Sequence, residues 1–255
     1  MNYNDIVKPI GLYEICSLII NNCSKSDVYK KCGIKPHHYI VNLDTGEGRT
    51  TLLEYITNMY KSFSILDFKS GLDDYLEIVF DGSFNQFKEM KLKIESAAVF
   101  SEAYHGIIGI DATSLITHKS ETQWTDYLTF IKKISKEANI IFFISTQPTK
   151  HDELYVNEII KNISNVERVN LAPYSKNEYV DIAIRYIENK GVRIECANEL
   201  NNLLLKEIQK DEINTLNAVI SIAEKFIFYA DFSGFTPTIS EKDLSKLVYK
   251  GERSK

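Results

Sequence analysis

The feature that most constrains the fold of this chain is a glycine-containing turn, LDTGEGRTT at residues 43–51. An apolar segment precedes it at residues 39–41, and apolar side chains at helical spacing follow it from Leu52 onward. A strand, a glycine-rich turn and a helix in this order are typical of a loop that binds phosphate through backbone N–H groups at the helix N-terminus. The turn therefore predicts an α/β fold with a phosphate-binding loop after its first strand.

The turn departs from the usual phosphate-binding pattern at two positions. That pattern is Gly-x-x-x-x-Gly-Lys-Ser/Thr, in which the lysine reaches the phosphates and the hydroxyl binds magnesium. Gly48 and Thr50 keep their places, but Leu43 replaces the first glycine and Arg49 replaces the lysine. A guanidinium is a wide planar fork rather than a compact point donor, so we expect Arg49 either to clash with the turn or to lie outside it.

Size, composition and charge are those of an ordinary globular protein. The chain has 255 residues, of which 44% are hydrophobic and 25% are charged, enough for one large core or for one core and a smaller second domain. Its net charge of −5 disfavours broad, sequence-independent DNA binding, which requires an excess of Lys and Arg. We therefore expect contact with nucleic acid only through a partner or a local basic patch.

The cysteines and histidines form no metal-binding pattern. The four cysteines contain no Cys-x-x-Cys pair, and the five histidines contain no pair at the helical spacing of metal ligands. The chain does not begin with basic residues before an apolar segment, and no apolar run approaches the ~20 residues that span a bilayer. These observations predict a cytoplasmic protein without a membrane segment, whose cysteines are reduced.

Hydrophobic patterns predict five strands that alternate with helices before residue 172. After two N-terminal helices within residues 10–32, we expect strands at residues 39–41, 63–68, 106–111, 140–144 and 166–171. Helical patterns lie between them, including an interrupted one at about residues 73–100 and others at about residues 124–136 and 153–162. Several of the strands are apolar throughout, which is typical of a parallel sheet covered by helices on both faces.

Three polar segments are expected to meet at one edge of this sheet. The glycine turn, Asp111 and the pair Ser145 and Thr146 each follow the end of a predicted strand. Ligands of open parallel sheets bind beyond the carboxyl ends of the strands. The three segments therefore predict one binding crevice.

The chain changes character at Ala172 and Pro173. Beyond this point only helical patterns follow, at about residues 176–190, 196–209, 213–229 and 241–249. We therefore expect an α/β domain at residues 1–171, which includes the N-terminal helices, and an all-helical domain at residues 172–255.

The order of these motifs resembles that of the AAA+ ATPase module. That module has a glycine loop, a strand that ends in an acid, a strand that ends in a polar residue, a fifth strand and a helical lid. The passage at residues 171–179 and the segments at residues 191–194 and 238–244 are also similar to this family. The resemblance covers about residues 10–250. It implies a three-layer fold with a five-stranded parallel P-loop sheet and a C-terminal all-helical lid.

The resemblance also implies a nucleotide site at the turn and at the ends of two strands. ATP or ADP with magnesium would contact the turn together with Asp111 and Thr146, and the magnesium ligands would be Thr50 and Asp111. The implied turn residues are Thr45, Gly46, Glu47, Gly48, Arg49, Thr50 and Thr51. The two glycines stand where positive φ and close approach of the backbone are needed.

Three departures remove groups that hydrolysis in this family uses. Arg49 stands in place of the lysine, and Ala112 stands where the glutamate that orients the attacking water is expected. Residues 194–252 contain no arginine, although a lid helix often supplies one to the γ-phosphate. Arg168, near the start of the fifth strand, is either an arginine that acts on a neighbouring subunit or a partly exposed strand residue.

These departures leave three interpretations of function. The first is an AAA+-like protein with degenerate or weak ATP binding and little or no hydrolysis, which acts as a regulatory or structural subunit. The second is an active ATPase in which Arg49 replaces the lysine and another acid, such as Glu47 or Glu102, positions water. The third is a nucleotide-free protein-interaction module. We expect a protein partner or assembly into a homo- or hetero-oligomer.

Overall fold

The computed structural model describes residues 6–33, 35–66, 74–79, 86–98, 104–112, 121–210, 213 and 215–245. The chain divides into two compact units, Met1–Leu171 and Ala172–Lys255. Each unit has a hydrophobic core of its own.

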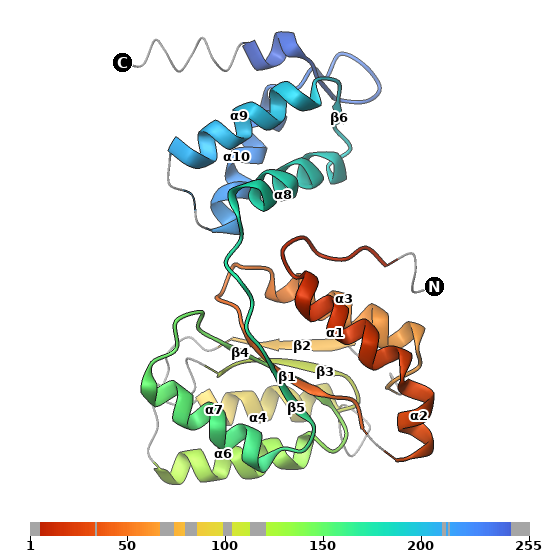
Figure 1. Ribbon diagram of the computed structural model, residues 1–255, viewed down its shortest axis with the longest axis vertical. Helices are drawn as coiled ribbons and strands as arrows, with labels where there is room; N and C mark the ends of the chain where they lie inside the picture. Colours follow the sequence, from red (N-terminus) through yellow and green to blue (C-terminus); the bar gives the residue numbers. More distant parts are fainter. Residues whose placement is uncertain are drawn as a thin grey trace. The chain divides into compact units, whose positions relative to one another are not determined.

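The first unit is built on a five-stranded parallel sheet with the strand order β2-β3-β4-β1-β5 (Figure 1). The strands are β1 (His38–Asn42), β2 (Tyr75–Ile78), β3 (Ile107–Asp111), β4 (Asn139–Ile144) and β5 (Val166–Val169). All pairings are parallel, and β1 lies between β4 and β5. The predicted α/β class with a five-stranded parallel sheet is confirmed.

Helices cover both faces of this sheet (Figure 1). On one side are α1 (Tyr13–Ser24), α2 (Ser26–Lys31) and α3 (Arg49–Ser62), and on the other are α4 (Gln86–Ala97), α6 (Glu121–Ile134) and α7 (Lys150–Asn162). Strand side chains alternate between the two faces. Ile110 and Phe142 pack in the core under α4, α6 and α7, whereas Gly109 and Phe143 lie on the face of Leu53, which belongs to α3. Among the described helices, none is long and apolar enough to cross a bilayer.

The second strand lies later in the chain than the sequence analysis predicted. We expected a strand at residues 63–68. Residues 63–66 instead form a turn after α3, so the prediction is wrong for these four residues, and residues 67–68 lie outside the described residues. The strand is Tyr75–Ile78, at the edge of the sheet and within a segment that was expected to be helical. Only Leu76 and Ile78 are buried in it. Two apolar side chains in a short segment fit a helix and a strand equally well, and for this reason the hydrophobic pattern did not distinguish the strand from a helix.

The second unit consists of helices and one very small sheet. Its helices are α8 (Lys176–Asn189), α9 (Ala197–Lys210) and α10 (Leu216–Phe228), and residues 241–245 are also helical. Two strands that the sequence analysis did not predict, β6 (Arg193–Ile194) and β7 (Thr238–Ile239), pair in parallel. Strands of two residues have no periodic pattern, so the sequence gives no signal for them.

Candidate functional site

The glycine turn joins β1 to α3 at the carboxyl edge of the sheet. Gly46 and Gly48 have φ angles of 84° and 96°, in the left-handed region that favours glycine. The Leu43 N–H donates to the Ile144 carbonyl at 3.0 Å and holds the start of the turn against β4. Gly48 has no side chain to cap α3, and uncapped N–H groups at a helix N-terminus favour an anion. The backbone of the turn therefore has a form that suits a phosphate.

The Arg49 side chain points to the ends of the strands. Its Nε donates to the Leu43 carbonyl at 2.7 Å, and its Nη1 donates to Asp111 Oδ2 at 2.9 Å. The guanidinium carbon also lies 5.1 Å from the centre of the Phe143 ring. The Arg49 side chain is only 5% exposed. Contacts from the ends of β1, β3 and β4 thus hold the guanidinium inside the protein.

Asp111 lies at the end of β3, and its carboxylate is the acceptor in the Arg49 ion pair. The Asp111 side chain is 8% exposed. To bind magnesium, this carboxylate would have to leave a buried cation, and removing one partner of a buried ion pair costs about 3–5 kcal/mol. The side chains of Arg49 and Asp111, as they are arranged, do not fit a magnesium nucleotide.

The two threonines at the site are also bonded to carboxylates of the protein. Thr50 Oγ1 donates to Glu77 Oε2 at 2.7 Å, and Thr146 Oγ1 donates to Asp44 Oδ2 at 2.5 Å. The turn, Asp111 and Thr146 are therefore brought together by direct contacts. Glu77 was missed by the sequence analysis because it lies on β2, the strand that was placed wrongly.

The remaining predicted residues lie on the surface of the turn or close to it. Thr45 and Thr51 are exposed, and Glu47 is half-buried. The Glu47 N–H donates to the Asp44 carbonyl at 3.1 Å, which closes the turn. Ser145 Oγ accepts a hydrogen bond from the Gln147 N–H at 3.2 Å, as expected of a hydroxyl in a turn.

Among the described residues, four carboxylates lie in the turn or beside it. They are those of Asp44, Glu47, Glu77 and Asp111; Arg49 is paired with Asp111, and Lys93 Nζ donates to the Glu77 carbonyl at 2.6 Å. Among the described residues, no three His, Cys, Asp or Glu side chains are grouped as metal ligands. Because like charges repel, the carboxylates beside the turn oppose a triphosphate, and the two cations offset them in part.

Ala112 is buried on the opposite face of the sheet from Arg49. It is 1% exposed and belongs to the hydrophobic core under α4, α6 and α7. Ala112 directly follows the last residue of β3 and comes two residues after Ile110. Because side chains alternate along a strand, Ala112 and Ile110 lie on the same face of the sheet. The position where the resemblance to the AAA+ module implies a glutamate is therefore apolar in this protein.

Arg168 is bonded within its own unit. Its Nη1 and Nη2 donate to Glu153 Oε2 and Oε1 at 2.6 and 2.7 Å. This bidentate bond joins β5 to α7 and lowers the pKa of Glu153 below its usual value. The guanidinium thus has a structural role in the described part of the chain.

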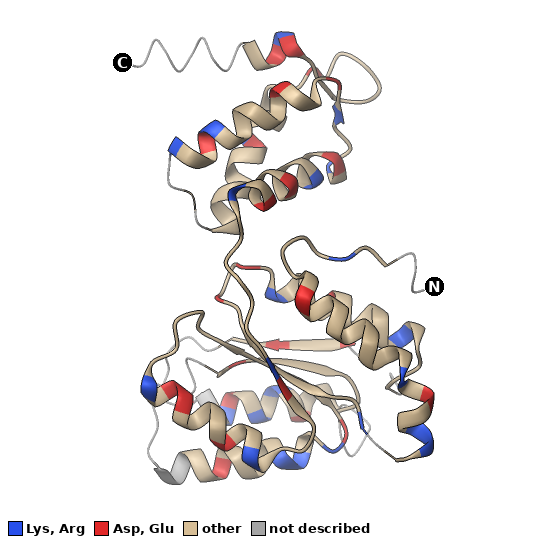
Figure 2. Cartoon of the chain, viewed as in Figure 1, with Lys and Arg blue, Asp and Glu red and all other residues tan. Residues whose placement is uncertain are grey.

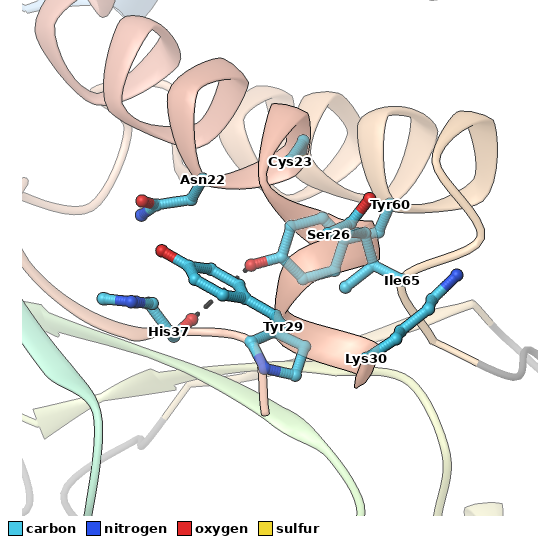
Figure 3. Close-up of a pocket in the computed structure, with 9 residues that line it drawn as sticks. Asn22, Cys23, Ser26, Tyr29, Lys30, His37, Tyr60 and Ile65 are labelled. Atoms are coloured by element: carbon cyan, nitrogen blue, oxygen red, sulfur yellow. Dashed lines mark hydrogen bonds between the residues drawn. The ribbon is translucent and has the colours of Figure 1, made fainter. Parts of the chain in front are cut away.

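A small cavity lies between the N-terminal helices and the end of α3 (Figure 3). It has a volume of about 30 Å³ and is lined by residues that include Asn22, Tyr29 and His37. The Tyr60 hydroxyl donates across it to the His37 carbonyl at 3.5 Å. This volume is about that of a single water molecule. The cavity is too small to bind a nucleotide or a metabolite.

The sequence matches no protein-family model and no curated protein. The fold is similar to solved structures of RuvB from Thermotoga maritima. A proline-to-glycine variant of RuvB matches with a TM-score of 0.52 and 12% identity over 89% of this chain and 65% of that chain. An alanine-to-serine variant matches with a TM-score of 0.49 and 12% identity over 84% of this chain and 62% of that chain.

This chain spans less than two thirds of the length of the RuvB chains that it matches. At 12% identity, the match with a TM-score of 0.52 shows a shared fold and nothing more specific. The shared fold includes the five-stranded parallel sheet, which in this chain has the strand order β2-β3-β4-β1-β5.

Proposed function

We propose that this chain is an AAA+-like P-loop protein that binds ATP or ADP weakly or not at all and hydrolyses little or none. It acts as a regulatory or structural subunit beside a protein partner. The observation that carries this proposal is the buried Arg49 side chain, which is bonded to Leu43 and Asp111. A lysine at this position would reach the phosphates of a bound nucleotide.

Nucleotide binding would require several internal bonds to be exchanged together. Asp111 would have to release Arg49, and Thr50 would have to release Glu77. The phosphates would then lie beside the carboxylates of Asp44, Glu47, Glu77 and Asp111, with the cations of Arg49 and Lys93 nearby. The exchange of these internal bonds opposes binding, whereas the backbone of the turn favours it.

Hydrolysis is disfavoured by a separate feature. A water molecule that attacks the γ-phosphate needs an acceptor that orients it. Ala112 is apolar and buried in the core, so it cannot supply one. Even a bound nucleotide would therefore turn over slowly, and we infer that the fold serves assembly rather than catalysis.

Isothermal titration calorimetry of the full chain with ATP and magnesium tests this proposal. We expect no saturable binding below about 1 mM for the natural chain. Arg49→Lys would remove the bond from Nε to the Leu43 carbonyl and supply a compact ammonium, and the variant should bind ATP at least about tenfold more tightly. Arg168→Lys makes the same change away from the turn and should leave binding unaltered. Micromolar ATP binding by the natural chain would overturn the proposal.

The Thr50–Glu77 bond favours an active ATPase as a second candidate. It places a carboxylate 2.7 Å from the hydroxyl that would bind magnesium, and this acid could take over the positioning of water. Steady-state ATP turnover by the natural chain, Glu77→Gln and Asp111→Asn distinguishes the two. Turnover near one per second that both variants abolish would establish this candidate in place of the first.

A further inference from the structure

The Arg49 side chain joins the two ends of the glycine turn. Leu43 is the first residue of the turn, and Arg49 is the first residue of α3. The bond from Arg49 Nε to the Leu43 carbonyl at 2.7 Å therefore closes a loop around residues 44–48. This loop contains Gly46 and Gly48, whose backbone freedom would otherwise allow the turn many conformations. The arginine thus restrains a turn that its glycines make flexible.

The same side chain connects the turn to the neighbouring strands. Arg49 Nη1 is bonded to Asp111 at the end of β3, and the guanidinium carbon lies 5.1 Å from the centre of the Phe143 ring of β4. The Leu43 N–H is bonded to β4 as well, through the Ile144 carbonyl. Both ends of the turn are therefore fixed on the sheet by contacts within the protein.

Burial distinguishes Arg49 and Asp111 from the other ion pairs of the chain. Acidic and basic residues are spread over its helices and turns (Figure 2). In each of the other ion pairs among the described residues, both side chains are at least 25% exposed. Those of Arg49 and Asp111 are 5% and 8% exposed. Water competes little for such a pair, so its hydrogen bond is stronger than one at the surface.

Two further bonds hold the turn on its exposed side. Thr50 donates to Glu77 on β2, and Lys93 of α4 donates to the backbone carbonyl of the same glutamate. Thr146, which follows β4, donates to Asp44 in the turn. These bonds are open to water, so each contributes less than the buried pair. The turn is thus connected to β2, β3 and β4 by bonds within the protein alone.

We propose that the Arg49 side chain is a built-in substitute for a bound nucleotide, which fixes the turn at residues 43–51 in one conformation. In the usual loop of this kind, phosphates hold the turn through its backbone N–H groups and its lysine. In this chain, the Leu43 carbonyl, the Asp111 carboxylate and the Phe143 ring hold it through the guanidinium. The surface that the turn offers to a partner protein is therefore the same with and without ATP. This inference rests on the proposed function, because it concerns the regulation of the same turn.

Hydrogen exchange of the turn, measured by mass spectrometry on the full chain, tests this proposal. The measured quantity is the exchange rate of a peptide that includes residues 43–52, in which the N–H groups of Glu47 and Leu52 donate to backbone carbonyls. Exchange at such amides reports local opening of the structure. We expect slow exchange in the natural chain, changed less than about twofold by about 1 mM ATP with magnesium.

A double variant removes the arginine bonds without leaving a buried charge. Arg49→Met together with Asp111→Leu replaces both partners by apolar side chains, a change that buried ion pairs often tolerate. The turn should then exchange at least about tenfold faster, while the strands of the sheet stay protected. Arg168→Met together with Glu153→Leu makes the same change at a more exposed pair and should leave exchange of the turn unaltered.

Arg49→Lys provides a second variant, which keeps the positive charge beside Asp111. A lysine lacks the guanidinium Nε and therefore loses the bond of this atom to the Leu43 carbonyl. Its turn should exchange at least about threefold faster than that of the natural chain. This variant decides the question if the double variant at Arg49 and Asp111 does not fold.

Three outcomes would overturn the proposal. One is exchange of the natural turn at about the rate of an unstructured peptide, with or without ATP. Another is a folded double variant at Arg49 and Asp111 whose turn exchanges as slowly as that of the natural chain. The third is an equal acceleration of the turn in the double variant at Arg168 and Glu153, which would reflect the stability of the whole sheet.

Calorimetry with ATP on the same samples separates this inference from the proposed function. Micromolar ATP binding together with slow exchange that ATP does not change would contradict the proposed function alone. Fast exchange of the turn without ATP binding would contradict the present inference alone.

Discussion

Arg49 and Asp111 form a hydrogen-bonded ion pair whose side chains are almost completely buried. In low dielectric surroundings, such a pair depends strongly on both partners, because the loss of one leaves the other charge buried without compensation. Arg168 and Glu153 form a bidentate pair with side chains that are 25% and 37% exposed. The more exposed pair thus has the better hydrogen-bond geometry, so a larger loss at Arg49 would be due to burial.

Replacing Arg49 by alanine should lower the free energy of unfolding by about 3 kcal/mol or more, because Asp111 is left buried and unpaired. Replacing Arg168 by alanine should cost about 1 kcal/mol or less, because water can solvate Glu153. Urea denaturation of the natural chain and both variants measures the difference. Equal losses for the two variants would show that burial of the Arg49 pair contributes no additional stability.

The sequence predicts where Arg49 and Asp111 stand in the chain, but it does not predict that they meet. The glycine turn and the strand before it identify the P-loop setting at residues 43–51 from local patterns alone. The direction of the arginine depends on the Leu43 carbonyl, the Asp111 carboxylate and the Phe143 ring, of which Asp111 and Phe143 are distant along the chain. A motif specifies the backbone of such a turn better than it specifies the partners of its side chains.

At the scale of elements, α3 packs closely against β3 at Gly109. A Cβ at this position would lie 2.7 Å from Leu53 Cδ1 and 3.0 Å from Phe143 Cε2. Both neighbours are fully packed in the core, so they have little room to move. The absence of a side chain at Gly109 thus sets the distance at which α3 rests on the sheet.

Gly109→Ala should therefore destabilise the protein by about 1–3 kcal/mol through overpacking. The melting temperature and the urea midpoint should both fall. Gly234→Ala is a matched control, because the nearest atom to its added Cβ is 3.8 Å away. Similar stability of the two variants would mean that α3 can move away from β3 at no cost.

His38 joins three neighbouring elements through its two ring nitrogens. Its Nδ1 accepts from the Ile140 N–H of β4 at 3.0 Å, and the ring also bonds to the Ser135 backbone just after α6. Burial, and then the charge of nearby His37, lower the pKa of His38 from 6.5 to about 4. The folded protein therefore holds this ring neutral under conditions in which the unfolded chain would protonate it.

Stability should fall as the pH decreases from about 6.5 to about 4, because the unfolded chain takes up a proton at His38 before the folded protein does. One pKa unit corresponds to about 1.4 kcal/mol, so the loss is about 3 kcal/mol by pH 4. Urea denaturation at a series of pH values measures it. His38→Asn should flatten this pH dependence, whereas His151→Asn, at an exposed position, should leave it unchanged.

The success of the sequence analysis at the scale of elements depended on the length and burial of each element. β4 is buried at all six of its residues, so its continuous apolar pattern was sufficient to predict it. β2 has four residues of which two are buried, and its partner strand β3 is distant in the chain. Pairing with β3, rather than local preference, determines the conformation of β2. The error at β2 also removed Glu77 from the predicted site.

At the scale of the whole molecule, the chain consists of two units that each enclose a core. The core of Ala172–Lys255 is formed by side chains of α8, α9 and α10, together with residues near β6 and β7. Its fully buried members include Leu200, Leu204 and Val219. A compact unit with its own core satisfies the condition for folding alone, and chains of this size do so with modest stability.

The segment Ala172–Lys255, expressed alone, should fold into a helical domain that unfolds cooperatively on heating. Circular dichroism measures both properties. Leu204→Ala removes a fully buried side chain from its core and should lower the free energy of unfolding of the segment by about 2–5 kcal/mol. Phe228→Ser changes a side chain that is 79% exposed and should cost far less. A segment without helical signal or without a cooperative transition would mean that the core of α8, α9 and α10 needs the rest of the chain. In that case, the boundary between Leu171 and Ala172 would separate two groups of contacts, but the second unit would not be stable by itself.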